Sequence, residues 1–461
     1  MWTKTFLLLL LLLGLAAPVS AAPQTVESLE LSVNLVWVMF GAVLVFFMHA
    51  GFALVETGFS RAKNALHILM KNFLTISLGA LLYFIVGFGL MFGDTIGHLF
   101  GSSGFLMNGR ADIDFFVFQA MFAATCATII SGAVAERMKL SSYFLIIVAM
   151  TAVIYPVVGH WIWADGWLAE IGFTDFAGST VVHLTGAVAA LTVVIFLGPR
   201  IGKYTGKKAN AIPAHNIPMG ALGVFILWLG WFGFNGGSTL AADPGLVPNV
   251  MATTLLSTSA AFVSSALYTQ WRFKKMDPTL SLNGVLGGLV GITAGAAEIS
   301  LGGSIIVGLV SGVILVEGVR FLETKARIDD PVGAITVHGI CGIWGTLAVG
   351  LFSTANGLFY GGGLTQLGVQ ALGVMAVIVW TMAGVGLYTA VLTWFSSIRV
   401  SREDEMAGLD FSEHGANAYE LSEALLANQT NDLNTDDQFG FGLAERLNRA
   451  GLQKLNKKPS L

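Results

Sequence analysis

The 461-residue sequence carries little charge, because Asp, Glu, Lys and Arg make up only 11% of it, against roughly 25% in an ordinary soluble domain. Hydrophobic residues make up 55%, and these proportions exclude a soluble enzyme. The 24 basic residues nearly balance the 28 acidic ones, so no basic face for a nucleic acid is predicted. Cysteine is also scarce. Cys126 and Cys341 both lie within long apolar runs, which leaves neither a disulfide framework nor a paired-cysteine metal site.

The sequence is instead rich in apolar runs, through which 56 glycines are spread, as in membrane helices that pack closely through small residues. Residues 1–22 are predicted to be a cleaved signal peptide, because their apolar stretch is shorter than a span of about 20 residues. Eleven apolar runs of spanning length follow, over residues 32–57, 72–94, 114–134, 142–163, 177–198, 216–236, 248–270, 280–297, 303–320, 333–353 and 366–397. The prediction is therefore an all-α polytopic membrane protein with eleven transmembrane helices over residues 23–397.

Basic residues distinguish the two sides of this predicted domain. Alternate connections hold Arg61, Lys63, Lys71, Arg137, Lys139, Arg200, Lys203, Lys207, Lys208, Arg272, Lys274, Lys275, Arg320, Lys325 and Arg327, and the remaining connections hold Arg110 alone. The positive-inside rule then places the mature N-terminus outside and the polar tail, residues 398–461, in the cytoplasm. A secretory signal peptide predicts the same orientation.

The pattern D-x2-G-x3-V-H occurs twice, from Asp175 to His183 and from Asp330 to His338. The two copies open the fifth and tenth runs, so the repeat unit has five spans and the halves are inverted around a central pore. Each histidine lies about 12 Å in from an opposite face, near the middle of a core about 30 Å thick. An ionisable side chain at that depth favours a pore or substrate site over a simple helix-helix hydrogen bond. Asp175 and Asp330 are expected to cap helix N-termini, and Asp175 also to favour an entering cation.

Four segments together resemble the ammonium transporter, methylammonium permease and Rhesus protein family. They are Phe116–Met138 (FVFQAMFAATCATIISGAVAERM), Asp175–His183 (DFAGSTVVH), Trp228–Ser238 (WLGWFGFNGGS) and Asp329–Gly342 (DDPVGAITVHGICG). Their order and spacing hold over residues 32–420. The resemblance implies a bacterial ammonium transporter of the cytoplasmic membrane, assembled as a homotrimer with one pore in each subunit. It implies no enzyme activity, no cofactor and no metal.

The resemblance also implies roles for aromatic residues at the outer end of the pore. Phe118, Phe122, Trp163 and Ser238 match an outer recruitment site for ammonium, where cation–π attraction would supply about 1–2 kcal/mol and the hydroxyl would accept an N–H. Phe122 and Phe234 match two stacked rings that close the pore just below. We call this pair the Phe gate.

His183 and His338 match the paired pore histidines of the family, which hydrogen-bond to each other in an apolar conduit. An intact cation is costly to desolvate there, and NH4+ differs from K+ in being able to give up a proton. We therefore expect deprotonation near the outer gate and passage of NH3 past the histidines. Whether the proton returns or crosses separately along the pair is left open, as is transport of methylammonium.

The run from Gly408 to Glu420 resembles the family's cytoplasmic tail motif, which docks under the neighbouring subunit, and bacterial members commonly meet a PII-type signalling protein on that face. One alternative is an ammonium-sensing transceptor acting through its tail. Another is a cation-coupled symporter for a different small amine. Such a symporter would need carboxylates near the middle of the membrane, whereas this sequence has histidines there, and its main intramembrane acid, Glu56, lies near the inner end of the first span. A zinc enzyme would want three or four protein ligands rather than two histidines.

Overall fold

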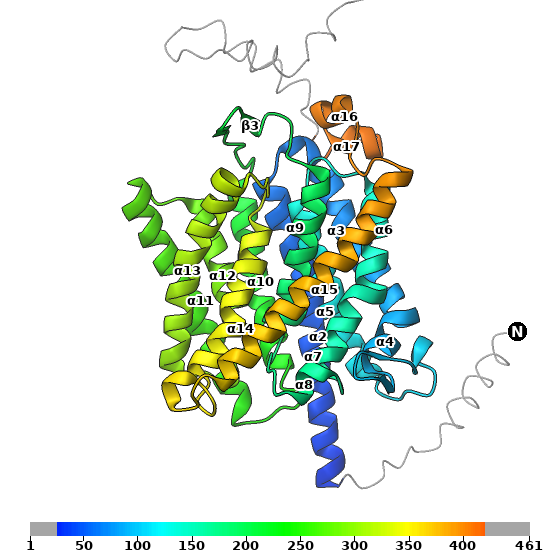
Figure 1. The fold of residues 1–461 in the computed structure, drawn as a ribbon, viewed down its shortest axis with the longest axis vertical. Helices are drawn as coiled ribbons and strands as arrows, with labels where there is room; N and C mark the ends of the chain where they lie inside the picture. The colour runs from blue at the N-terminus through cyan, green and yellow to red at the C-terminus, as the bar shows by residue number, and fades with distance from the viewer. Residues whose placement is uncertain (1–24, 420–461) are drawn as a thin grey trace, which may run out of the picture. The chain divides into compact units, whose positions relative to one another are not determined.

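The computed structural model describes residues 25–419. The predicted signal peptide and residues 420–461 lie outside them. The described residues up to Ala416 belong to one compact unit of packed helices (Figure 1), and residues 417–419 of the second unit form no helix or strand.

The first half of the unit contains α2 (Val26–Phe59), η1 (Ala62–Asn64), α3 (Ala65–Leu82), η2 (Tyr83–Gly87), α4 (Phe88–Phe92), β1 (Thr95–Ile96), β2 (Phe100–Gly101), η3 (Phe105–Met107), α5 (Ile113–Ala133), α6 (Leu140–Ala149), η4 (Met150–Ile154), α7 (Tyr155–Trp163), α8 (Trp167–Glu170), η5 (Ser179–Leu184) and α9 (Thr185–Leu197). The strands form two-residue antiparallel pairs in connections, here β1 with β2.

The second half contains β3 (Tyr204–Thr205), β4 (Lys208–Ala209), α10 (Ile217–Gly237), α11 (Leu246–Phe273), α12 (Pro278–Thr293), α13 (Leu301–Phe321), η6 (Leu322–Ala326), η7 (Ile335–Ile340), α14 (Cys341–Phe352), η8 (Leu358–Tyr360), α15 (Thr365–Phe395), α16 (Arg402–Ala407) and α17 (Leu409–His414). β3 pairs with β4. Among the described residues, 10 helical stretches are long and apolar enough to cross a membrane, and α12, with 16 residues, is a shorter apolar helix. The fold is thus helical and polytopic, as the sequence predicts.

α2 and α10, the first helices of the two halves, pack closely along each other. A Cβ added at Gly51 would lie 2.8 Å from Leu227 Cγ, and one added at Gly58 would lie 2.5 Å from the backbone N of Gly220. Large apolar side chains on the outer surfaces of α2 and α15 are exposed instead, as at Phe46. These exposed faces suit lipid contact.

The two copies of the repeated motif fold into the same N-terminal turn. Gly178 and Gly333 have φ of 116° and 80°, a conformation that side chains other than glycine adopt at a cost. Asp175 accepts hydrogen bonds from the backbone N–H groups of residues 178–181, at 2.8–2.9 Å. Asp330 accepts from Gly333 N and Ile335 N. Each carboxylate thus begins a helix whose first turns, η5 and η7, are π-helical.

Lys71 lies inside a helix. The prediction that it belongs to the connection after the first span is therefore wrong. The second span begins at Ala62 rather than near residue 72, so Lys71 falls in α3 with no exposed surface. Its Nζ donates to the Ser131 carbonyl of α5 at 2.7 Å. That hydrogen bond, with Glu56 of α2 nearby, explains how the apolar helix accommodates a lysine.

Candidate functional site

One cavity gathers all four residues that the sequence analysis assigns to recruitment. It measures about 140 Å³ and is lined by Phe115, Phe118, Gln119, Phe122, Trp163, Phe176, Ser238 and Leu240. The lining comes from the N-terminal half of α5, the end of α7, the turn before η5 and the residues just after α10. Helix ends from both halves of the chain therefore form the walls.

Hydrogen bonds to backbone fix two of the cavity's polar side chains. Trp163 Nε1 donates to the carbonyl of Asp175 at 2.7 Å, which ties the indole to the turn before η5. Ser238 Oγ donates to the carbonyl of Phe234 at 2.8 Å. Because that bond uses the hydroxyl hydrogen, the Ser238 oxygen keeps lone pairs for an N–H donor.

Stacked rings separate this cavity from the interior. Phe122 and Phe234 lie 4.0 Å apart between centroids with 23° between their planes, and both are buried. Phe118 packs on the cavity side of Phe122, at 4.6 Å. On the inner side, Phe234 stacks with His183 at 5.4 Å. A small molecule leaving the cavity along this line would have to displace the two phenyl rings.

The two motif histidines meet beneath the rings. His183 Nδ1 and His338 Nδ1 lie 3.2 Å apart, so one donates a hydrogen to the other, according to their tautomers. Both side chains are buried, and His183 Nε2 has no hydrogen-bond partner among the described residues. Trp231 also stacks on His183, at 4.9 Å between ring centroids. The imidazoles therefore stand as a polar pair in an aromatic and aliphatic surround.

A narrow cavity continues the line on the far side of His338. It measures about 20 Å³ and is lined by Phe52, Val55, Glu56, Thr128, Ile129, Gly132, Asn283, Leu286, Val332, Ala334, Val337 and His338. A wider cavity of about 140 Å³ lies beyond it and shares Asn283 and Val332 with it. Asp330 and Thr336 line this wider cavity. Except for Asp175, whose carboxylate caps η5 and lines none of these cavities, the sequence-predicted residues thus lie along one line from the Trp163 cavity to the Asp330 cavity.

Two residues on this path were missed by sequence reasoning, and so was Lys71, which lines none of the three cavities. Gln119 Oε1 is buried in the first cavity without a hydrogen-bond partner among the described residues. Trp231 stacks on His183, and its Nε1 donates to Thr293 Oγ1 at 2.8 Å. Both lie in segments that carry the family resemblance, so their positions were available as a signal. Lys71 was visible only as a cation beside an apolar run.

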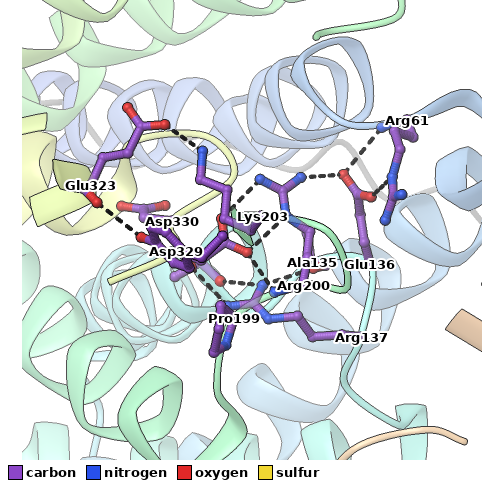
Figure 2. A network of polar contacts seen from close by, with 12 residues as sticks. Arg61, Ala135, Glu136, Arg137, Pro199, Arg200, Lys203, Glu323, Asp329 and Asp330 are labelled. Carbon is purple, nitrogen blue, oxygen red and sulfur yellow. Dashed lines mark hydrogen bonds and ion pairs between the residues drawn. The ribbon is translucent and has the colours of Figure 1, made fainter. Parts of the chain in front are cut away.

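Charged residues form a network at the Asp330 end (Figure 2). Arg200 makes three hydrogen bonds to Asp329, two from its guanidinium and one from its backbone N. It also binds Glu136, which in turn pairs with Arg61. Burial raises the pKa of Asp329, but the hydrogen bonds and charges of Arg200 and Arg137 outweigh it and hold the pKa at about 2. Burial raises the pKa of neighbouring Asp330. The network joins connections of both halves.

Within residues 25–419, no group of three or more His, Cys, Asp or Glu side chains could hold a metal ion.

Comparisons with known proteins cover most of the chain. The model of the Ammonium Transporter Family matches residues 36–419. A putative ammonium transporter of Synechocystis sp. is 41% identical over 407 residues, which cover 85% of this chain and 90% of the relative. Ammonium transporter Amt2 of Archaeoglobus fulgidus is 41% identical over 442 residues, covering 89% and 94%.

Solved structures agree with the sequence comparisons. A protein described as Sensor Amt Protein has a TM-score of 0.82 and 38% identity, over 84% of this chain and 100% of its own. Mep2 of Candida albicans has a TM-score of 0.75 and 27% identity, over 85% and 93%. The likeness to solved structures therefore extends over most of the chain.

Proposed function

The chain belongs to the Ammonium Transporter Family, which is a family of membrane transporters rather than enzymes, and from this membership we propose how it moves ammonium. NH4+ is recruited in the Trp163 cavity and loses a proton near the Phe gate, and NH3 then passes the histidine pair. The observation that carries the proposal is the alignment of the recruitment cavity, Phe gate, histidine pair and inner cavities on one path.

The recruitment step uses aromatic faces and a free acceptor. Phe118, Phe122 and Trp163 border the same cavity as the Ser238 oxygen, so a cation there meets both π-faces and a lone pair. The buried Oε1 of Gln119 offers a second acceptor. Since hydrogen bonds to NH4+ replace part of its water shell, selection begins before the gate.

The deprotonation step follows from desolvation. Behind Phe122 and Phe234 the histidine pair lies against aromatic rings, and the 20 Å³ cavity beyond it is lined mostly by apolar side chains, with Glu56, Thr128 and Asn283 as its other polar residues. A K+ filter instead stabilises an intact cation with a ring of carbonyl oxygens. A neutral NH3 can accept from or donate to the imidazoles as it passes. The 3.2 Å contact between His183 Nδ1 and His338 Nδ1 also allows a proton to cross the pair, which would make transport electrogenic.

The membrane arrangement is part of the same proposal. With α12 the chain crosses the membrane eleven times. Spans one to five and six to ten form the inverted repeat. The Trp163 cavity faces outward in a bacterial inner membrane. The tail and the Arg200 network then face the cytoplasm. We further propose a homotrimer, open to a PII-type protein on that cytoplasmic face. The basic connections and the two D-x2-G-x3-V-H turns support this arrangement.

The test is to reconstitute purified protein into liposomes and record both current and internal pH after ammonium and K+ pulses. We expect an ammonium response without a K+ response, and a loss of that selectivity in His338→Ala. His49→Gln is the matched control, because His49 is also a buried span histidine but lines none of the cavities described above. A wild-type protein that is folded yet gives no ammonium response overturns the proposal, and so does a His338→Ala protein with unchanged flux and K+ exclusion.

A sensing role is the second candidate, favoured by the 38% identity to Sensor Amt Protein. It would act through the tail, and it is distinguished by the same liposomes, since a sensor without flux would bind ammonium but move neither charge nor pH.

A further inference from the structure

Glu56 is a carboxylate buried beside the conduit, and the transport steps above do not use it. It lies in α2 with 2% of its surface exposed, and it lines the same 20 Å³ cavity as His338. Phe52, one helical turn earlier, packs its ring 6.1 Å from the His338 ring. Glu56, from the first half of the sequence, and His338, from the second half, therefore line the same small cavity.

Neighbouring side chains hold the carboxylate in place. Its Oε2 accepts hydrogen bonds from Ser131 Oγ at 2.6 Å and from Asn72 Nδ2 at 3.2 Å. Oε1 accepts from no other described side chain, so its lone pairs remain for a molecule in the cavity. The charged group that faces Glu56 from α3 is Lys71, whose Nζ donates to the Ser131 carbonyl.

The small size of the cavity limits what can lie beside Glu56. A space of about 20 Å³ admits one water-sized molecule, since about 10–15 Å³ is needed for one, and NH3 is of similar size. The next cavity has about 140 Å³ and room for several waters. Glu56 thus stands at the last single-file position, just before the path widens enough to hydrate a cation.

We propose that Glu56 is the proton-exchange group at the cytoplasmic end of the conduit, passing to ammonia the proton that crosses the histidine pair. This inference rests on the proposed function. In inward transport the His338 imidazolium gives its proton to the Glu56 carboxylate, directly or through the molecule between them. The carboxyl O–H bond then breaks as a new N–H bond forms on NH3. NH4+ leaves through the wider cavity, and the carboxylate and neutral imidazole are restored.

A structural role for the Glu56 and Lys71 pair accounts for fewer of these contacts. A buried ion pair adds little to stability compared with apolar packing, because both groups must be desolvated. The Lys71 ammonium donates to a backbone carbonyl rather than to Glu56, and the carboxylate lines a cavity. A glycine stands opposite it, since a Cβ at Gly132 would lie 3.5 Å from Glu56 Cγ.

The experiment compares charge movement with ammonia passage in liposomes containing wild type, Glu56→Gln or Glu56→Asp. For Glu56→Gln we expect the ammonium current to fall about 100-fold, within the range that a positioned proton-transfer group contributes. Internal alkalinisation, which wild type should not show while NH3 and its proton arrive together, should appear in this variant, because NH3 then passes alone and takes up a proton in the lumen. Glu56→Asp should restore part of the current. Glu298→Gln is the matched control, because it makes the same change outside the three conduit cavities.

The outcomes separate this inference from the function on which it rests. No ammonium response in wild type would refute the transport proposal itself. A wild type that alkalinises the lumen without current, or a Glu56→Gln protein with unchanged current, would overturn the role of Glu56 alone. A Glu56→Gln protein that loses the current without gaining alkalinisation would show a structural role. If Glu56→Gln does not fold, the Glu56→Gln/Lys71→Met protein removes both charges and is measured in the same way.

Discussion

At the scale of single residues, the Trp163 indole determines the shape of the recruitment cavity. Its Nε1 is bound to the Asp175 carbonyl, and a Cβ at Gly178 would lie only 3.2 Å from its ring. The ring of Phe122 meets it edge to face at 6.0 Å. The indole therefore has little freedom, and its face is presented to the cavity before ammonium arrives.

We predict that Trp163→Leu raises the KM for ammonium about 5- to 30-fold, as expected for losing about 1–2 kcal/mol of cation–π attraction. Maximal flux should change less, because the Phe gate and histidines are untouched. Trp163→Phe keeps an aromatic face, so its KM should lie between those of wild type and Trp163→Leu. The measurement is current against ammonium concentration in liposomes. An unchanged KM in Trp163→Leu would remove the indole from recruitment.

Residues differ in how far the sequence alone could place them. Trp163 and Ser238 belong to motifs with fixed spacing, so their position at helix ends was predictable. Lys71 was not, because hydropathy ends an apolar run at a charge, whereas the partner that permits the charge lies on another helix. The contact of Glu56 with the His338 cavity depends in the same way on how α2, α5 and η7 pack.

At the scale of elements, the repeated motif performs two different tasks with one turn. Asp175 caps four backbone N–H groups, and its own carbonyl holds Trp163. Asp330 caps two, and the residue before it, Asp329, binds Arg200. The cap and the glycine were predictable from the pattern D-x2-G. The π-helical turns that follow, η5 and η7, were not predictable, because nothing in the spacing distinguishes them from an α-helical turn.

The tail helix α17 binds the start of α3, and we predict that Asp410→Ala releases it. Asp410 Oδ1 accepts the backbone N–H of His67, and Asn64 Oδ1 accepts that of Leu409. His414 Nε2 lies 3.2 Å from His67 Nδ1. Losing the acceptor leaves a buried N–H unpaired and should cost about 1 kcal/mol, as for a helix cap.

Limited proteolysis of the purified protein tests this prediction. Cleavage after Arg402 should accelerate about fivefold in Asp410→Ala, since 1.4 kcal/mol corresponds to tenfold in an opening equilibrium. Asp410→Asn retains an acceptor oxygen and should remain near the wild-type rate. Equal cleavage rates in all three proteins would show that the tail is held by its other contacts, such as Lys63 Nζ with the Met406 carbonyl.

At the scale of the whole molecule, hydropathy locates apolar helices along the chain but does not fix where they end. The run over 280–297 becomes a helix that ends at Thr293. There the carbonyls of Thr293 and Ala294 accept hydrogen bonds from the backbone of Ala177 and Phe176, in the turn that precedes η5. The helix therefore ends because a distant segment uses its last carbonyls. A sequence window cannot contain that information.

The Arg200 network joins the two halves, and its stability should depend on pH through Asp329. An Asp pKa of about 2 in the folded protein lies below the ordinary value near 3.9. Such a group stabilises the fold fully above its ordinary pKa and loses this contribution as the pH falls through about 2. The contribution is on the order of 2 kcal/mol at neutral pH.

We therefore expect Asp329→Asn to lower the melting temperature of the detergent-solubilised protein at pH 6, because Arg200 keeps its charge beside a neutral amide. The difference from wild type should shrink as the pH falls from about 4 toward 2, where Asp329 itself becomes protonated. Asp94→Asn, at an exposed carboxylate outside the network, should match wild type throughout. A difference that stays constant with pH would mean that Asp329 acts through the shape of its hydrogen bonds and not through its charge, and the two halves would then be joined by packing alone.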